Sequence, residues 1–341
     1  MSAICVRGAR SQMCSQPHPA RDSALDGARK AGNTNAIATL LPGTRLTLVL
    51  AHLSDPHVGP LPAPGWRDLI GKRLTGYWNW HSHRHDIHNM AVLAAIVDDI
   101  AASAADHIAL TGDLVNLGLG AEFPLAAHSL AKLGGPDQVS IVPGNHDAYV
   151  AASMRHMAAS FASFMAGDDG VAAFPYLRRR GGIALIGLSS AIPTLPFLAE
   201  GAMGKTQLAG FEAMLAACHA EGLPVVVMIH HPPHHAGARL FRRLRDAAAL
   251  EAILARHGAS LVLHGHNHKY SLAELPGPNG TTVPVVGVAS ASAVPGDAAH
   301  RAAWHLFRLT PRGKTLAITL DVRGMAAPGA PVTLLDSVTI R

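Results

Sequence analysis

Histidine, aspartate and asparagine residues gather in five short motifs of this 341-residue sequence. Their imidazole nitrogens and carboxylate or amide oxygens suit Zn, Mn, Fe or Co better than Mg or Ca. No cysteine belongs to the motifs, which disfavours a closed structural zinc site. A pair of ions needs more ligands than any one motif offers, so distant motifs must act together. The motifs are Asp55-Pro56-His57, Gly112-Asp113, Gly144-Asn145-His146-Asp147, His230-His231-Pro232-Pro233 and Gly265-His266-Asn267-His268.

A short apolar segment with the pattern of a buried strand stands directly before each motif. Strands that alternate with helices indicate layered α/β packing, and ligands bind where the strands of such a sheet end. The region 283–340 has strand-like runs and little helix, so we expect it to complete a sheet. The expected strands are 46–53, 107–110, 139–142, 183–188, 225–229 and 260–263, and the expected helices are 90–105, 122–133, 206–219 and 246–257.

Composition indicates a globular protein with a sizeable core. Hydrophobic residues make up 49% and charged residues 15%, which excludes wholesale disorder. The apolar runs are far shorter than the roughly 18 residues of a spanning helix, so we expect no integral membrane protein. Three scattered cysteines form no disulfide framework and favour a reducing cytoplasm. We expect a disordered N-terminal tail over 1–45 and one domain over 46–341.

The ordered motif set D-x-H, G-D, G-N-H-[DE], H and G-H-x-H resembles that of the calcineurin-like metallophosphoesterase superfamily. The resemblance covers residues from about 50 to about 270. It implies a four-layer α/β sandwich, in which helices flank two mixed β-sheets and a dinuclear metal site lies at the strand ends. It also implies that Asp113 bridges two metal ions and that His146 faces the substrate phosphate. Of the remaining ligands, Asp55, His57 and His268 would hold one metal, and Asn145, His230 and His266 the other.

Three neighbouring residues carry further expectations. His231 is the alternative to His230 as the ligand from the fourth motif, and His230 is preferred because it directly follows the strand. Asp147 is expected either to orient the metal ligands without binding the metal itself or merely to cap the following helix. Asn116, in the loop after Asp113, is a second candidate for such a positioning role.

The resemblance predicts a phosphoesterase, most closely of the branch that contains class III cyclic-nucleotide and glycerophosphodiester phosphodiesterases. Two divalent or trivalent ions about 3.5–4 Å apart, with Mn, Fe or Zn as candidates, would activate a water for attack on phosphorus. His146 would donate a proton or hydrogen bond near the leaving oxygen. A small or lipid-like phosphate diester is the expected substrate. The alternatives are a nuclease, which is disfavoured because the basic clusters are short, and a non-catalytic binding module, which is disfavoured because no motif is missing.

Two segments outside the motifs allow competing interpretations. Residues 66–84 combine three of the four tryptophans with arginine and lysine, which suits a substrate cap or a surface that touches lipid headgroups. The alternative is an insertion that packs its aromatic rings on its own domain. Histidines 81, 83, 85 and 88 either bind an extra metal or form a solvated loop. Arginines 239, 242, 243 and 245 either pair with phosphate or form a solvated face.

Overall fold

The computed structural model describes residues 47–84, 86–294 and 300–341. The chain divides into two units, 1–44 and 45–341, and the elements below belong to the second. The expected tail over 1–45 and the histidine at position 85 lie outside the described residues. Among the described residues, no helix is both long enough and apolar enough to cross a bilayer.

The first of two β-sheets has six strands in the order β12-β11-β10-β1-β2-β3. Its three strands β1, β2 and β3 run parallel to one another, and β10 joins β1 in antiparallel fashion. The parallel strands therefore all end at the same edge of the sheet. The bounds are β1 Leu48–Leu53, β2 His107–Leu110, β3 Val139–Ile141, β10 Ala303–Arg312, β11 Thr315–Met325 and β12 Val332–Thr339.

The second sheet also has six strands, in the order β4-β5-β6-β7-β9-β8. Strands β5, β6, β7 and β9 are parallel, and antiparallel strands close both ends. A parallel bridge between Ser54 and Ser290 connects the end of β1 to the segment after β9. The bounds are β4 Tyr176–Arg180, β5 Ile183–Gly187, β6 Val225–Met228, β7 Leu261–His264, β8 Ser271–Pro276 and β9 Thr282–Gly287.

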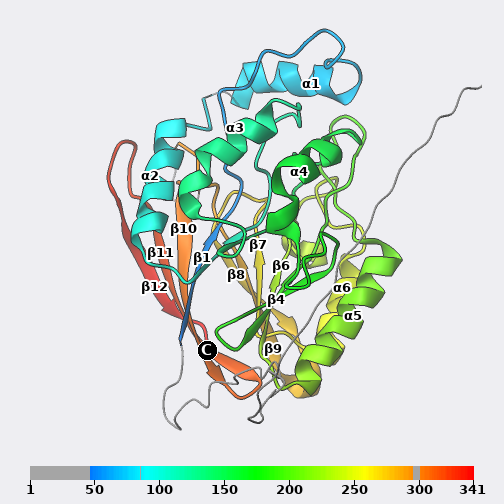
Figure 1. Ribbon diagram of the computed structural model, residues 1–341, viewed down its shortest axis with the longest axis vertical. Helices are drawn as coiled ribbons and strands as arrows, with labels where there is room; N and C mark the ends of the chain where they lie inside the picture. The colour runs from blue at the N-terminus through cyan, green and yellow to red at the C-terminus, as the bar shows by residue number, and fades with distance from the viewer. Residues whose placement is uncertain (1–46, 85, 295–299) are drawn as a thin grey trace, which may run out of the picture. The chain divides into compact units, whose positions relative to one another are not determined.

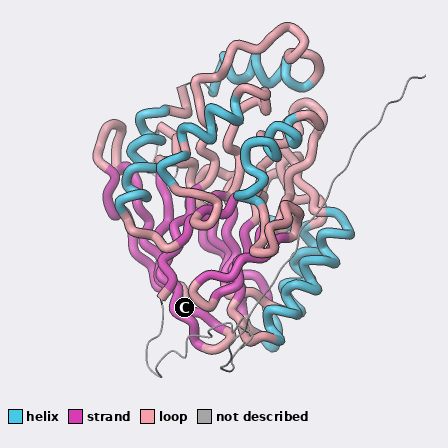
Figure 2. Tube along the Cα trace, in the orientation of Figure 1, coloured by secondary structure: helices cyan, strands magenta, loops and turns pink. Residues whose placement is uncertain are grey.

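Helices cover the two sheets from outside. Figure 1 shows α2 and α3 on the side of the first sheet and α5 and α6 beside the second, and Figure 2 shows the strands gathered between them. Helix α1 lies at the top of the view, above α3. The bounds are α1 Lys72–Asn79, α2 Met90–Ala102, α3 Glu122–Ser129, α4 Ser153–Phe161, α5 Gly204–Ala220 and α6 Ala247–His257, with a π-helical turn over Trp80–Arg84 after α1.

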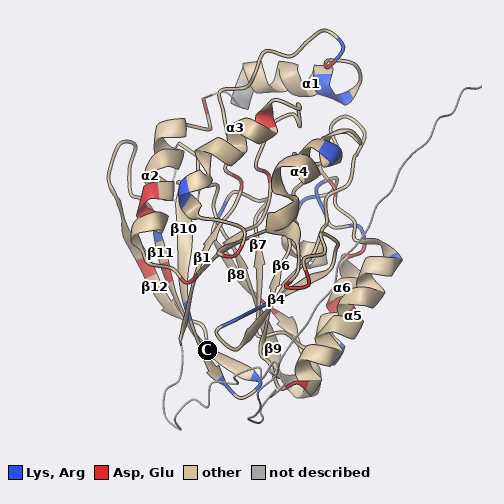
Figure 3. Cartoon of the chain, viewed as in Figure 1, with Lys and Arg blue, Asp and Glu red and all other residues tan. Residues whose placement is uncertain are grey.

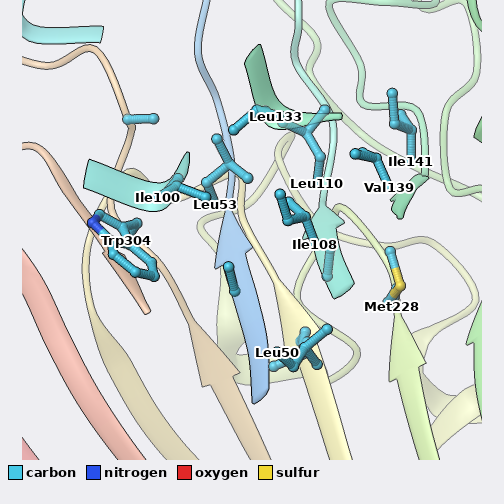
Figure 4. Packing of buried hydrophobic residues seen from close by; sticks show 14 of the residues in the cluster. Leu50, Leu53, Ile100, Ile108, Leu110, Leu133, Val139, Ile141, Met228 and Trp304 are labelled. Atoms are coloured by element: carbon cyan, nitrogen blue, oxygen red, sulfur yellow. The ribbon is translucent and has the colours of Figure 1, made fainter. Parts of the chain in front are cut away.

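The main core lies between the sheets and under α2. Leu50, Leu110 and Met228 are fully buried in it, so both sheets contribute to a single apolar cluster. Figure 4 shows Ile100 of α2 close to Trp304 of β10. A second cluster fills the space between the second sheet and helices α5 and α6, where Phe211 and Leu250 are buried. Burying both faces of a largely parallel sheet explains why its strands have continuous apolar sequences.

The predicted α/β architecture, with two mixed sheets flanked by helices, is confirmed. The predicted strands and helices are present with end shifts of a few residues, as expected where helix ends fray. The chain after residue 283 does complete the sheets, and β10, β11 and β12 extend the first one. Helices α1 and α4 were not predicted, because their short sequences contain glycine, histidine and serine and lack a strong apolar period.

Candidate metal centre and active site

All five motifs meet at one edge of the two sheets. Strands β1, β2 and β3 end just before Asp55, Asp113 and Asn145, whereas β6 and β7 end just before His230 and His266. The backbone N–H of His266 donates to Asp55 Oδ2 at 3.0 Å, across the boundary between the sheets. The parallel strand order therefore brings together side chains that are up to 213 positions apart, from Asp55 to His268.

The side chains form two potential metal-binding clusters that share Asp113. In each cluster the candidate ligand atoms lie within 4.8 Å of one another. Asn145 joins the second cluster, since its Oδ1 lies 3.3 Å from His230 Nε2. All seven residues predicted as ligands are thus brought together. The first cluster contains Asp55, His57, Asp113 and His268, and the second contains Asp113, His230 and His266.

Hydrogen bonds fix the ring orientation of three of these histidines. His57 Nδ1 and His230 Nδ1 donate to the backbone carbonyls of Val115 and Thr111, and His266 Nε2 donates to that of Arg242. A ring nitrogen that donates to a carbonyl must carry the proton, so the other nitrogen presents a lone pair to the cluster. Metal-binding histidines are held in this way in proteins.

Five of the seven candidate ligands have left-handed backbone conformations. Asp55, His57, Asp113, His266 and His268 have φ between 39° and 69°. Each such non-glycine residue costs about 1–3 kcal/mol and persists only where the surroundings impose it. Such conformations cluster at functional sites, and here they turn the side chains of three motifs into the same space.

Glycines in the motifs permit a close approach between loops. Gly112 has φ of 89°, and a Cβ added there would lie 2.5 Å from the backbone nitrogen of Gly144. A Cβ on Gly144 would lie 2.3 Å from Asp113 Oδ1. Only glycine fits at both positions, which explains why each acidic or amide ligand is preceded by a glycine in the second and third motifs.

The electrostatics of the clusters suit cations. Burial alone would raise the pKa of Asp113, but His230, His146 and His57 outweigh it and hold the pKa well below its usual value. Burial disfavours a charge on His230, yet Asp113 raises its pKa to about 9. Asp55 Oδ1 is buried and lies 3.2 Å from His268 Nε2. Protons and metal ions compete for these same lone pairs, so the residues present fit divalent cations.

Asp147 holds the second and third motifs together. Its carboxylate accepts hydrogen bonds from the backbone N–H groups of Asp113, Leu114, Val115 and Gly144 at 2.8–3.3 Å. Burial and the nearby Asp113 raise its pKa to about 7. Helix α4 begins six residues later, at Ser153, so Asp147 does not cap it. These contacts give Asp147 a positioning role for the loop that carries Asp113.

His146 and Asn116 are linked to each other. His146 Nδ1 donates to the backbone carbonyl of Asn116, which fixes the tautomer of the ring. The Asn116 side chain donates to the carbonyls of His57 and Val58. Buried Glu122, which the sequence did not reveal, accepts the N–H of Asn116. Asn116 thereby connects the loop of His57 to the ring of His146.

His231, the alternative ligand from the fourth motif, lies in neither cluster. Its Nδ1 pairs with the hydroxyl of Ser190 at 2.8 Å, and its Nε2 pairs with the carbonyl of Ala199 at 3.1 Å. With both nitrogens engaged, the ring supports the loop over 190–199 rather than presenting a lone pair to the cluster.

A pocket of about 480 Å³ opens in front of the clusters. His146, Asp113 and His268 line it, and so do the cationic residues Lys72 and Arg242. Lys72 Nζ donates to Thr194 Oγ1 and to the carbonyl of Leu198, and it lies 4.6 Å from the centre of the Tyr149 ring. Neither cation was predicted individually, because their positions depend on how separate loops fold back over the strand ends.

Helix α1 forms one wall of this pocket, contributing Lys72, Trp78 and Asn79. Figure 3 shows basic residues at one end of this helix. The buried guanidinium of Arg73 anchors the helix by donating to the carbonyls of Leu117 and Gly118. Tyr77 packs on the small cluster around Tyr149, but Trp66 and Trp78 remain exposed. Segment 66–84 is therefore anchored to the domain and lies beside the pocket, but Trp66 and Trp78 do not pack their rings on the domain as the alternative expected.

Among the histidines of segment 81–88 whose side chains the structure describes, His88 lies next to the first cluster. Its ligand atom lies within 4.8 Å of those of His57 and His268, which gives a third candidate group. His81 contacts the rings of Tyr77 and Trp80 instead. Of the four arginines after the fourth motif, Arg242 reaches the pocket, whereas Arg245 pairs with Glu200.

The family follows from the sequence match and the site geometry together. The pattern described as calcineurin-like phosphoesterase matches residues 48–270, about two thirds of the chain. The chain belongs to the calcineurin-like phosphoesterase family. A comparison with curated proteins finds no relative that matches this chain.

Solved structures with the same fold share little sequence with this chain. A dimetal phosphatase from Danio rerio is 13% identical with a TM-score of 0.57, and the match covers 87% of this chain and all of that one. A purple acid phosphatase from yellow lupin, Lupinus luteus, is 12% identical with a TM-score of 0.56 over 88% of this chain. The present chain spans about half, 54%, of the lupin phosphatase. At these identities the similarity establishes the fold alone.

Proposed function

We propose that this protein is a two-metal phosphodiesterase that hydrolyses small or lipid-like phosphate esters. The observation that carries the proposal is the pair of ligand clusters that share Asp113. Asp55, His57 and His268 would hold one ion, Asn145, His230 and His266 the other, and Asp113 both. Two ions held there would lower the pKa of a water toward neutrality and offset charge on the phosphoryl oxygens.

The chain's own residues orient the ester. His146 lines the pocket, and its bond to the Asn116 carbonyl directs the other ring nitrogen away from that carbonyl. When that nitrogen carries a proton, it can donate to an ester oxygen, a role worth on the order of 10²–10⁴ in rate. Lys72 and Arg242 line the same pocket and provide positive charge for a phosphate.

A diester is favoured over a monoester because the pocket extends well beyond the clusters. Its lining includes Trp78, Phe197 and Leu198, which offer an apolar surface to a second ester group. The branch with cyclic-nucleotide and glycerophosphodiester phosphodiesterases, and a cytoplasmic location, remain predictions from the sequence.

A hydrolysis screen tests the proposal. The protein with added Mn²⁺ is assayed on bis(p-nitrophenyl) phosphate, p-nitrophenyl phosphate, cyclic AMP, glycerophosphodiesters and single-stranded DNA. We expect the wild type to hydrolyse diesters. The rate should fall by a factor on the order of 10² or more in Asn145→Ala, which loses a candidate metal ligand, and in His146→Ala, which loses a hydrogen-bond donor to the ester. His128→Ala, at an exposed position of α3, serves as the matched control. Activity on monoesters alone would refute the diesterase, and a preference for DNA would favour the nuclease.

A further inference from the structure

Exposed apolar side chains gather around the mouth of the pocket. Twelve large hydrophobic residues are exposed in the described part of the chain, and eight of them lie in the three segments 66–78, 194–199 and 239–243. Phe197 is 83% exposed and Trp66 is 74% exposed. We call this set the apolar rim, and it consists of Trp66, Ile70, Leu74, Trp78, Leu195, Phe197, Leu240 and Phe241.

Hydrogen bonds hold the three rim segments next to one another. Lys72 on the first segment donates to Thr194 and Leu198 on the second. The N–H of Ala199 donates to the carbonyl of Phe241 on the third at 2.9 Å. All three segments also line the pocket, through Trp78, Phe197 and Arg242. The rim segments are therefore contiguous, and each of them contributes a residue to the pocket that holds the candidate metal centre.

Positive charge accompanies the rim. Its three segments contain six arginine or lysine residues and one acid, Asp68. Asp68 lies 3.8 Å from Arg73, so its charge is offset locally. Arg67 packs over the ring of Trp66 at 4.9 Å, and Arg239 and Arg242 line a second hollow beside Lys269. Tryptophan, aliphatic side chains and cations on one exposed surface have the chemistry of proteins that bind anionic lipid surfaces.

We propose that the apolar rim docks on an anionic lipid surface and that the substrate is an amphiphilic phosphate ester drawn from that surface. The substrate class rests on the proposed function, whereas the docking does not. Exposed patches of this kind on a soluble fold mark interaction sites. A lipid surface explains both properties of the rim, because its acyl region accepts the apolar side chains and its headgroups pair with the arginines. The phosphate of a docked amphiphile would enter the pocket directly.

Vesicle sedimentation tests the docking without any turnover. The full chain is mixed with vesicles of phosphatidylcholine alone or with added phosphatidylglycerol. We expect binding to the anionic vesicles that weakens with salt, since surface charges are screened over about 8 Å at physiological ionic strength. The substitutions Trp66→Ser, Leu74→Ser and Phe241→Ser should each lower binding about tenfold. Val171→Ser and Leu272→Ser, at exposed positions on other segments, are the matched controls.

Each other outcome overturns the docking. Failure of the wild type to bind anionic vesicles would contradict the docking, and so would an equal loss of binding in the rim and control variants. Light scattering tests the alternative of a second copy of the chain. If the wild type self-associates, does not bind vesicles, and the rim variants no longer self-associate, the rim is an interface between two copies. Circular dichroism of each variant verifies its fold.

A separate assay addresses the substrate class. Hydrolysis of lysophosphatidylcholine is compared with that of glycerophosphocholine, which has the same headgroup and no acyl chain. We expect a higher kcat/KM for the acylated ester, and the rim variants should reduce this preference. Equal kcat/KM values for both esters would contradict the proposal of an amphiphilic substrate but would not contradict the proposed phosphodiesterase activity. Inactivity on every ester, with vesicle binding retained, would instead refute the proposed function.

An independent observation concerns His88. Its backbone is fixed beside the site by a bridge to Ala293, and the N–H of Asn89 donates to the carbonyl of Ser292. Its Nδ1 pairs with Ser292 Oγ at 2.8 Å, and its ring centre lies 4.4 Å from that of His57. We infer that His88 supplies a further nitrogen ligand to a cation beside His57 and His268, the two residues whose ligand atoms lie within 4.8 Å of its own.

Metal titration tests this role with a readout other than activity. Mn²⁺ affinity is measured by calorimetry and the Co²⁺ absorption spectrum is recorded for the wild type, His88→Ala and His81→Ala, the control from the same segment. We expect His88→Ala to weaken one of two sites about tenfold or more and to change the Co²⁺ spectrum. Unchanged affinity and spectrum would overturn the inference. If the wild type binds no metal, the proposed function itself fails.

Discussion

Lys72 shows how a single residue acquires a property that its type does not predict. It stands at the start of α1, yet its amine reaches Thr194 and Leu198 across the pocket wall. Burial lowers its pKa to about 8, although Asp113 acts in the opposite direction. The amine is therefore charged below that pH and neutral above it, so the positive charge on this wall of the pocket depends on pH.

We expect the KM for a diester anion to rise as the pH passes about 8, because the Lys72 ammonium then loses its proton. Lys72→Arg should remove this rise, since a guanidinium stays charged. Lys72→Ala should raise KM about tenfold or more below pH 8, by loss of a charge-assisted hydrogen bond. Steady-state kinetics against pH measure all three. Lys205→Ala, exposed on α5, is the control, and a flat KM profile for the wild type contradicts the role.

The candidate metal ligands and Lys72 differ in what the sequence reveals of them. Asp113 and Asn145 follow apolar strands directly, so the parallel sheet alone predicts that they meet. Lys72 at the start of α1 and Arg242 in the loop after β6 belong to segments whose path over the strand ends depends on contacts such as that of Arg73 with Leu117. No local pattern encodes those contacts, and both cations were visible in the sequence only as members of charged clusters.

At the scale of elements, strands β10 and β11, which lie beyond the residues 48–270 matched by the family pattern, contribute to the core. Strand β10 pairs with β1 along five residues and carries Trp304, whose side chain is fully buried. The indole donates to Asp99 of α2, and Arg323 of β11 makes two further bonds to the same carboxylate. One helix and two strands are thereby joined next to the strand that leads to Asp55.

Trp304→Ala should lower the free energy of unfolding by about 3–5 kcal/mol, because it leaves a large cavity between α2 and the first sheet. Urea denaturation monitored by circular dichroism measures the change. Leu334→Ala on β12, where the side chain is 53% exposed, should change stability by less than about 0.5 kcal/mol. A loss for Trp304→Ala as small as that of the control would mean that β10 is not integral to the core.

Element prediction succeeded where burial imposes a simple pattern and failed where it does not. Strands such as β6 are buried on both faces and have continuous apolar sequences, so their bounds were found within a residue or two. Helix α1 has polar and aromatic residues on all sides and buries chiefly Arg73. Its position is set by the carbonyls that accept hydrogen bonds from Arg73, which a periodicity search cannot detect.

At the scale of the whole molecule, the candidate metal centre joins the two sheets. Asp55, Asp113 and Asn145 follow strands of the first sheet, and His230 and His266 follow strands of the second. Cations bound between them would add contacts that exist only in the folded state, since the unfolded chain scatters the same ligands over more than two hundred residues. Metal binding must then stabilise the fold by mass action.

Melting followed by circular dichroism should therefore depend on metal. At a free Mn²⁺ concentration about 100 times the dissociation constant, each site contributes about 2.7 kcal/mol. For the 297 residues of the unit 45–341, two occupied sites together correspond to a rise in Tm on the order of 5–10 °C over the chelator-treated protein. Asp113→Ala should lose most of the rise because Asp113 belongs to both clusters, whereas the control His128→Ala should retain it. Identical melting of the wild type with and without Mn²⁺ would show that no ion binds between the sheets.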